Sequence, residues 1–151
     1  MLFSSFVLAE ETVDSVLVDK SEEKLFLLSG DTIVAEYSVA FGGDPKGHKQ
    51  KEGDEKTPEG HYILDYKKSD SSFYKAIHIS YPNEADKNAA AALGVDPGGL
   101  IMIHGQRNGL GWLAWITQLF NWTDGCVGVT NSDMDEIWDA VAENTPIEIR
   151  E

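Results

Sequence analysis

Leu100-Ile101-Met102-Ile103-His104-Gly105 is an apolar run that ends in a histidine and a glycine. A short continuous apolar run between turn residues is typical of a buried strand. Pro97-Gly98-Gly99 precedes the run and predicts a turn. We therefore predict a buried strand that delivers His104 at its end.

Other β patterns lie on both sides of this strand. The predicted strands are Ser15 to Asp19, Lys24 to Leu28, Asp31 to Ala40, His61 to Tyr66, Ala76 to Ser80 and Ile147 to Ile149. Alternating apolar residues define most of them, and Ser29-Gly30-Asp31 predicts a hairpin turn between the second and the third. A polar, glycine-rich loop runs from residue 41 to Gly60, and loops of this length in a small domain are often functional.

Two segments are predicted to be helices. Asn83 to Leu93 is alanine-rich and is followed by Gly94. Asn131 to Val141 places its apolar residues at i, i+3, i+4 and i+7, with Thr130 or Asn131 as the cap and Pro146 beyond the end. Trp138 in this helix is predicted to be core. Together these patterns predict a mostly-β or α+β single domain with a few short helices.

Length and charge limit the possible functions. The 151 residues suffice for one domain with a real core. The net charge of −14 argues against binding to nucleic acid or anionic lipid, since both require a positive surface. No apolar run is long enough for a transmembrane helix. Residues 1–9 resemble the end of a secretory leader, so we expect a protein of the periplasm or cell envelope.

Cys126 is the only cysteine, so it cannot form a disulfide within the chain. It is either a small buried apolar residue or a chemical group. His104 lies 22 positions before it and can take the thiol proton, because imidazole is the usual partner of a catalytic thiol. The carbonyl of Gly105 could fix the tautomer of His104, and Gly125 allows a sharp turn that could aim backbone amides at an oxyanion.

The remaining polar and aromatic residues leave alternatives open. His78, on the polar face of its strand, either lines a substrate groove or is structural, and the four histidines lack metal-ligand spacing. The aromatic segment from Gly111 to Phe120, together with Trp122, forms either a lid over the thiol or a packed helix. The lysines of the glycine-rich loop either meet substrate carboxylates or are solvated: Lys46, Lys49, Lys51 and Lys56.

The combination of motifs resembles the L,D-transpeptidase catalytic domain, also called the YkuD domain. His104-Gly105 followed by Thr123-Asp124-Gly125-Cys126 is similar to the family's histidine and Ser/Thr-His-Gly-Cys motifs. Gly53 to Tyr62 resembles the family's segment with Thr-Pro-x-Gly, and His78-Ile79-Ser80-Tyr81-Pro82 resembles a branch of secreted murein enzymes. The resemblance assigns residues 13–150 to this catalytic domain.

This resemblance implies a β-sandwich that acts on peptidoglycan stem peptides through a thioester, without a metal or organic cofactor. It makes Cys126 the nucleophile and His104 its base, with the Gly105 carbonyl orienting His104 and the amides of Gly125 and Cys126 as oxyanion donors. The residues expected to contact substrate are His78, Tyr81, Trp122, Thr123 and Asp124. We expect a monomer whose partners are stem peptides and, in one alternative, a wall-linked protein.

The sequence also departs from the family pattern. Asp124 replaces the motif histidine, Gly128 replaces an arginine or asparagine, and the spacing of 22 between His104 and Cys126 is longer than usual. These departures leave the acyl acceptor open. The alternatives to a transpeptidase are a thiol hydrolase of the same fold, either an L,D-carboxypeptidase or an amidase that releases wall-linked protein, and an inactive peptidoglycan-binding module.

Overall fold

Three strands at the start of the chain form an antiparallel meander. The computed structural model describes residues 12–69, 74–106 and 125–151. Strand β1 (Ser15–Asp19) pairs with β2 (Lys24–Ser29), which pairs with β3 (Thr32–Ser38). Gly30 has a φ of 60° in the turn between β2 and β3, a conformation that glycine adopts without strain. The predicted hairpin is therefore confirmed.

The eight strands in the described ranges belong to one mixed sheet. The others are β4 (Gly60–Lys68), β5 (Ala76–Ile79), β6 (Met102–His104), β7 (Val127–Gly128) and β8 (Thr145–Arg150). Their order is β3-β2-β1-β8-β4-β5-β6-β7, with β1 and β8 parallel, β6 and β7 parallel, and the other pairs antiparallel. The last strand therefore lies in the middle of the sheet, where it joins the N-terminal meander to the strands that carry His104.

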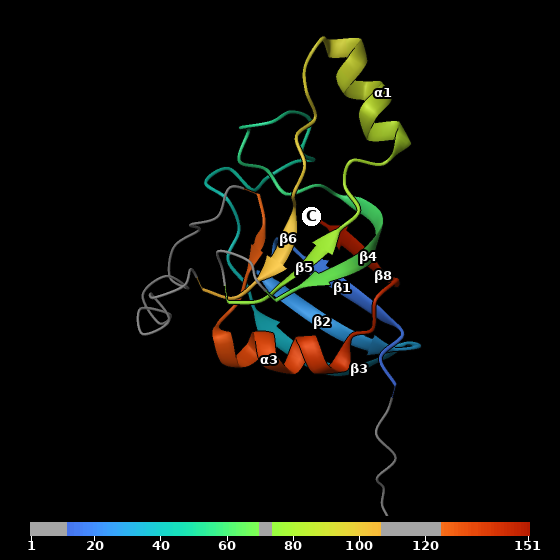
Figure 1. Cartoon of the computed structure of the whole chain (residues 1–151), viewed down its shortest axis with the longest axis vertical. Helices are drawn as coiled ribbons and strands as arrows, with labels where there is room; N and C mark the ends of the chain where they lie inside the picture. Colours follow the sequence, from blue (N-terminus) through green and yellow to red (C-terminus); the bar gives the residue numbers. More distant parts are fainter. Residues whose placement is uncertain (1–11, 70–73, 107–124) are drawn as a thin grey trace, which may run out of the picture.

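The sheet curls around one hydrophobic core (Figure 1). Apolar side chains from both ends of the sheet meet there, among them Val18, Leu25, Leu64, Ile77, Ile103 and Val127. The mostly-β or α+β single-domain fold is confirmed. The two layers expected of a sandwich are the two halves of this single curled sheet.

Helix α3 (Asn131–Ala140) closes the core (Figure 1). Thr130 caps its first turn by accepting a hydrogen bond from the Asp133 amide. Met134 and Ile137 are fully buried, whereas Trp138 is only partly buried and packs against the core edge. The amphipathic pattern thus predicted the helix, but Trp138 covers the core instead of filling it.

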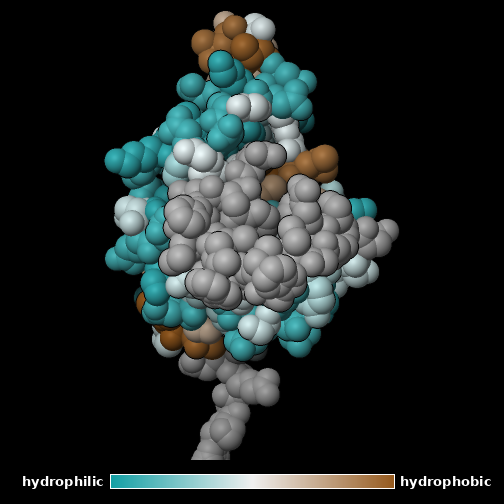
Figure 2. Space-filling model, turned by 90° about the vertical axis from the view of Figure 1, so that its left-hand side faces the viewer, coloured by the Kyte–Doolittle hydropathy of each residue, from teal (hydrophilic) through white to brown (hydrophobic). Residues whose placement is uncertain are grey.

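Helix α1 (Glu84–Leu93) projects away from the sheet (Figure 1). Asn83 and Asp86 form a reciprocal capping box, and Gly94 ends the helix in the left-handed conformation. Only Ala90 is buried, and Leu93 is 60 % exposed. Apolar surface consequently gathers at this tip, directly above hydrophilic surface (Figure 2). No helix in the described ranges combines the length and apolar character that crossing a bilayer requires.

Several element boundaries differ from the sequence expectation, among them those near Leu100 and Pro146. Leu100 was expected in the buried strand, but it has a φ of 55° and is 72 % exposed, so β6 begins only at Met102. The turn through Gly98 and Gly99 extends by one residue at the expense of the strand. Pro146 does not end helix α3, which stops at Ala140; it lies within β8.

Buried ions hold the loop between β3 and β4. The Lys20 ammonium donates to the carbonyls of Gly47 and Thr57 and to the Glu59 carboxylate. Burial would raise the pKa of Asp54, but hydrogen bonds from backbone amides and from Lys49 hold it below its usual value. Lys49 and Lys56 are paired with Asp54 and Asp44, so these two lysines are not available to substrate carboxylates. The loop is thereby fixed, and its Glu52 and Thr57 bond to Asp96 and Gly125, which precede β6 and β7.

Candidate active site

The parallel pairing of β6 and β7 brings His104 and Cys126 to the same region. Ile103 pairs with Val127 and His104 with Gly128, and Cys126 directly precedes β7. Ile103 and Val127 both belong to the core, so their sequence neighbours face the other side of the sheet. Residues two apart on neighbouring strands are about 8 Å apart at Cα, which places the thiol and the imidazole within reach of one another.

The His104 ring is buried and is oriented by the backbone. Its Nδ1 lies 2.7 Å from the Gly105 carbonyl oxygen, so Nδ1 carries the proton and donates it. Nε2 is then the basic nitrogen. Burial lowers the pKa of His104 from 6.5 to about 4, although hydrogen bonds to the backbone partly oppose this. His104 is therefore neutral at pH 7, the state that a general base requires.

Gly105, whose carbonyl orients His104, is packed so closely that a side chain at this position would collide with its neighbours. A Cβ there would lie 2.7 Å from Asn131 Oδ1 and 3.0 Å from the Tyr74 Cβ. Its amide donates to Lys75 O, and the next amide, that of Gln106, donates to Asn131 Oδ1. The first residue of helix α3 thus anchors the turn that orients His104.

The Cys126 thiol is partly exposed and lies next to the turn before β6. Its Sγ donates to the Leu100 carbonyl oxygen at 3.5 Å. The positive φ of Leu100 shapes this turn. A thiolate cannot donate, so this contact belongs to the protonated thiol, and the sulfur must turn away from Leu100 when it loses its proton.

Gly125 forms the sharp turn that the sequence predicted. Its φ is +110°, and its carbonyl accepts a hydrogen bond from the buried Thr57 hydroxyl at 2.9 Å. A Cβ at this position would lie 2.7 Å from the carbonyl oxygen of Lys56. The loop between β3 and β4 therefore packs directly on the residue before the thiol.

Replacing Gly125 by alanine is expected to destabilise the protein by about 2 kcal/mol or more, because both the positive φ and the contact with a backbone oxygen oppose a side chain. Thermal unfolding would measure the loss. Gly99→Ala is the matched control, since a Cβ at Gly99 meets no atom within 4 Å. Equal stability of the two variants would show that the turn at Gly125 tolerates a side chain.

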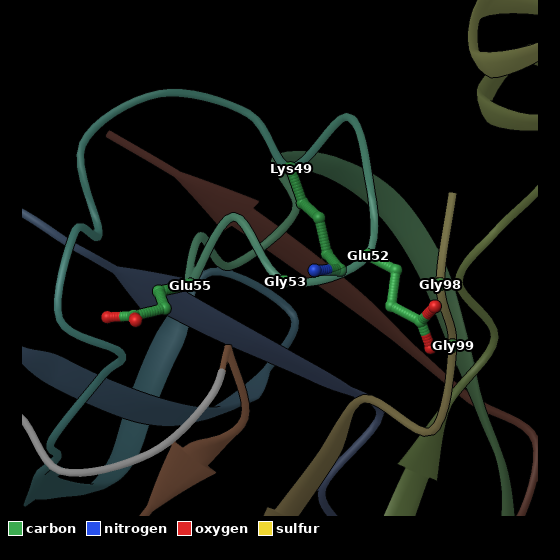
Figure 3. A pocket seen from close by; sticks show the side chains of 6 residues that line it. All are labelled: Lys49, Glu52, Gly53, Glu55, Gly98 and Gly99. Atoms are coloured by element: carbon green, nitrogen blue, oxygen red, sulfur yellow. The ribbon is translucent and has the colours of Figure 1, made fainter. Parts of the chain in front are cut away.

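A pocket of about 420 Å³ opens beside the turn before β6, lined by Lys49, Glu52, Gly53, Glu55, Gly98 and Gly99. Figure 3 shows Glu52 reaching across it toward Gly98 and Gly99, while Glu55 points to the opposite side. The amide of Glu52 donates to Asp96 O, which ties the two walls together. Leu100, whose carbonyl contacts the thiol, directly follows this wall.

The predicted substrate contacts have different locations. His78 lies half-buried on the sheet face opposite the core, as the alternation predicted. Tyr81 is 2 % exposed and belongs to the core, and its hydroxyl donates a hydrogen bond to Pro97 O. We therefore do not include it among the proposed substrate contacts. Trp122, Thr123 and Asp124 lie outside the described residues, as does the segment from Gly111 to Phe120.

Sequence reasoning missed three residues that shape the site. Thr57 was noted only as part of a motif, and Leu100 and Asn131 were assigned to a strand and a helix. The Thr57-Pro58 step in a long loop was the one available signal. The roles of Leu100 and Asn131 depend on backbone contacts that no residue pattern encodes.

The curled sheet, the Cys126 thiol and the His104 imidazole define a class of protein. It is a mostly-β domain in which an oriented imidazole ends one strand and a thiol directly precedes the parallel strand beside it. No three His, Cys, Asp or Glu side chains within residues 12–69, 74–106 and 125–151 gather as a metal site would require.

Comparison with known proteins gives the family. The model of the L,D-transpeptidase catalytic domain (YkuD) matches residues 14–149, and the chain belongs to this family. It is 37 % identical over 107 residues to the Escherichia coli K12 protein named "Putative L,D-transpeptidase YafK", a match that covers 70 % of this chain and 36 % of that protein.

Solved structures agree with this fold. The helical cell shape determining protein Pgp2 of Campylobacter jejuni, as its K307A mutant, is 26 % identical with a TM-score of 0.71, covering 94 % of this chain and 48 % of that one. Bd1075 of Bdellovibrio bacteriovorus is 29 % identical with a TM-score of 0.63, covering 92 % and 48 %. The chain thus spans about a third to a half of the length of these relatives.

Proposed function

We propose that this chain is a cysteine-dependent L,D-transpeptidase of the cell envelope that acts on peptidoglycan stem peptides. The proposal is supported above all by the pairing of β6 with β7, which brings Cys126 and His104 to the same region. His104 is oriented there by the hydrogen bond that its Nδ1 donates to the Gly105 carbonyl. Family membership supports the substrate class, because the family is defined by L,D-transpeptidase catalytic domains.

The first half of the reaction forms the acyl-enzyme. His104 Nε2 takes the thiol proton as Sγ of Cys126 attacks the carbonyl after an L-centred residue of the stem peptide. The C–S bond forms, and the developing negative charge on oxygen is met by the amides of Gly125 and Cys126. His104 then returns the proton to the leaving amine, and a thioester remains.

The second half resolves the thioester. An amine attacks its carbonyl, gives up a proton to His104 and displaces the thiolate, which is then reprotonated. Water in place of the amine gives a shortened peptide, so the same residues support the hydrolytic alternative, including an amidase that releases wall-linked protein. The pocket beside Gly98 and Gly99 supports this proposal as a candidate site for one arm of the stem peptide, because Leu100, whose carbonyl contacts the thiol, directly follows it.

Incubation with disaccharide-tetrapeptides and with a protein–peptidoglycan conjugate tests the proposal. Chromatography with mass detection separates the products. Dimers with a new L,D bond are expected. Shortened peptides or released protein would instead establish the hydrolase, and complete inertness of both substrates would indicate a binding module.

A further inference from the structure

A β-bulge in β4 gathers three side chains around His78. The pairing of β4 with β5 shifts register between Leu64 and Tyr66, which leaves Asp65 as the extra residue. A bulge re-aims the side chains beside it, and bulges are common next to active sites. Here it allows Asp65 and Tyr66, neighbours in sequence, both to contact His78.

The contacts are close and specific. His78 Nδ1 lies 2.6 Å from Asp65 Oδ1, and the Tyr66 ring stacks on the imidazole with centroids 4.5 Å apart and planes at 10°. The His78 side chain is 14 % exposed and that of Asp65 38 %. A half-buried imidazole that is both stacked and bonded to a carboxylate has its orientation fixed, and solvent still reaches the carboxylate.

Strand register relates this cluster to the thiol. Tyr66 pairs with His78, and His78 pairs with Met102, so the three form one row across the sheet. Because β6 and β7 pair at Ile103 and Val127, Cys126 extends the same row on the far side of Met102. Two strand spacings separate His78 from Cys126, about 10 Å between their Cα atoms. Alternation around the core residues Ile77 and Val127 assigns both His78 and Cys126, which directly precedes β7, to the sheet face opposite the core.

The chemistry of the cluster suits a cationic amine. The bond to Asp65 places a proton on Nδ1 of the neutral ring, which leaves Nε2 as a hydrogen-bond acceptor. In that tautomer the imidazole nitrogen and the carboxylate oxygens are all acceptors, and the carboxylate carries the negative charge. An ammonium group offers three donors and one positive charge, and the acidic surface of this chain (net charge −14) attracts it.

We propose that Asp65, Tyr66 and His78 form the subsite for the primary amine of the acyl acceptor, or of the amine released when an amide is cleaved. This inference rests on the proposed function. It adds the chemical class of one substrate group, because it assigns an aliphatic ammonium group to the cluster on the β5 side of Cys126. Asp65 and His78 bind the ammonium, and Tyr66 holds the imidazole in place.

Binding is tested without any turnover. Nα-acetyl-lysine amide is titrated into the protein while the imidazole ¹⁵N resonances are followed, with Nα-acetyl-norleucine amide and acetate as comparison probes. His61, which is exposed on the neighbouring strand β4, serves as the internal control. Saturable shifts of His78 by the lysine probe alone, lost in Asp65→Asn, are expected. Equal shifts from norleucine or acetate, or no loss in the variant, would overturn the subsite.

Turnover gives a second readout. The ratio of aminolysis to hydrolysis with Nα-acetyl-lysine amide as acceptor is expected to fall about tenfold in Asp65→Asn and in His78→Gln, as for the loss of one charge-assisted hydrogen bond. Alkylation of Cys126 is expected to be unchanged. An unchanged ratio in both variants contradicts the subsite. If no acyl transfer occurs at all, the proposed function fails, and the binding titration still decides the subsite.

Discussion

Replacing Cys126 by alanine is expected to abolish processing of stem peptides, with a loss of at least about 10³-fold, because the proposed acyl-enzyme forms on its sulfur. The thiol is partly exposed and its contact with Leu100 O is long, so the fold should tolerate the change. Product formation measured by chromatography gives the rate, and thermal unfolding confirms the fold.

Cys126→Ser sharpens this test. The hydroxyl is nearly the size of the thiol and can donate to Leu100 O, but its much higher pKa keeps it protonated beside a weakly basic imidazole. We expect a loss as large as that for alanine. A serine variant that retains a tenth of the activity would mean that the sulfur is not the nucleophile.

Replacing His104 by glutamine is expected to have the second largest effect. Loss of a positioned general base costs about 10²–10⁴-fold in rate. Glutamine keeps a polar group near the Gly105 carbonyl but cannot take the thiol proton. Alkylation of Cys126 by iodoacetamide near neutral pH should also slow down in this variant, since glutamine cannot take the thiol proton as the sulfur attacks. His61→Gln, at an exposed position on β4, is the matched control and should leave both rates unchanged.

The same variant reports on the buried imidazole through stability. The pKa of His104 is about 4 in the folded protein and 6.5 in the unfolded chain, so below pH 6.5 the unfolded state binds a proton that the folded state does not. Stability is therefore lost as the pH falls from 6.5 to 4, by about 3 kcal/mol. Chemical denaturation at pH 7 and pH 4 should show this loss in the wild type and a correspondingly smaller one in His104→Gln. An identical pH dependence would mean that His104 is not buried in its neutral form.

Local patterns predicted most of the fold. Alternation of apolar residues located the strands, and the spacing of Met134 and Ile137 located helix α3. The pairing of β1 with β8 joins the two ends of the chain and was not predictable, because periodicity reports which face of a strand is buried and not which strand lies beside it. Leu100 was misplaced for a related reason: its apolar side chain suggested burial, whereas the preceding glycines allow a turn that exposes it.

The site was predictable only in part. The thiol and the imidazole could be found because few residue types perform this chemistry, and Gly125 because a turn was needed there. The hydrogen bonds from Thr57 to Gly125 and from Gln106 to Asn131 join distant segments, so they became visible only in three dimensions. Tyr81 looked like a substrate contact from its motif, but its ring is needed in the core.

The most direct test of the central claim is the mass of the intact protein within seconds of mixing with a disaccharide-tetrapeptide. A transient adduct with the mass of the donor minus its leaving group is expected. Peptide mapping should place it on Cys126, hydroxylamine should remove it, and Cys126→Ala should not form it. Turnover of the peptide without any adduct on Cys126, or with one on another residue, would contradict the thioester mechanism.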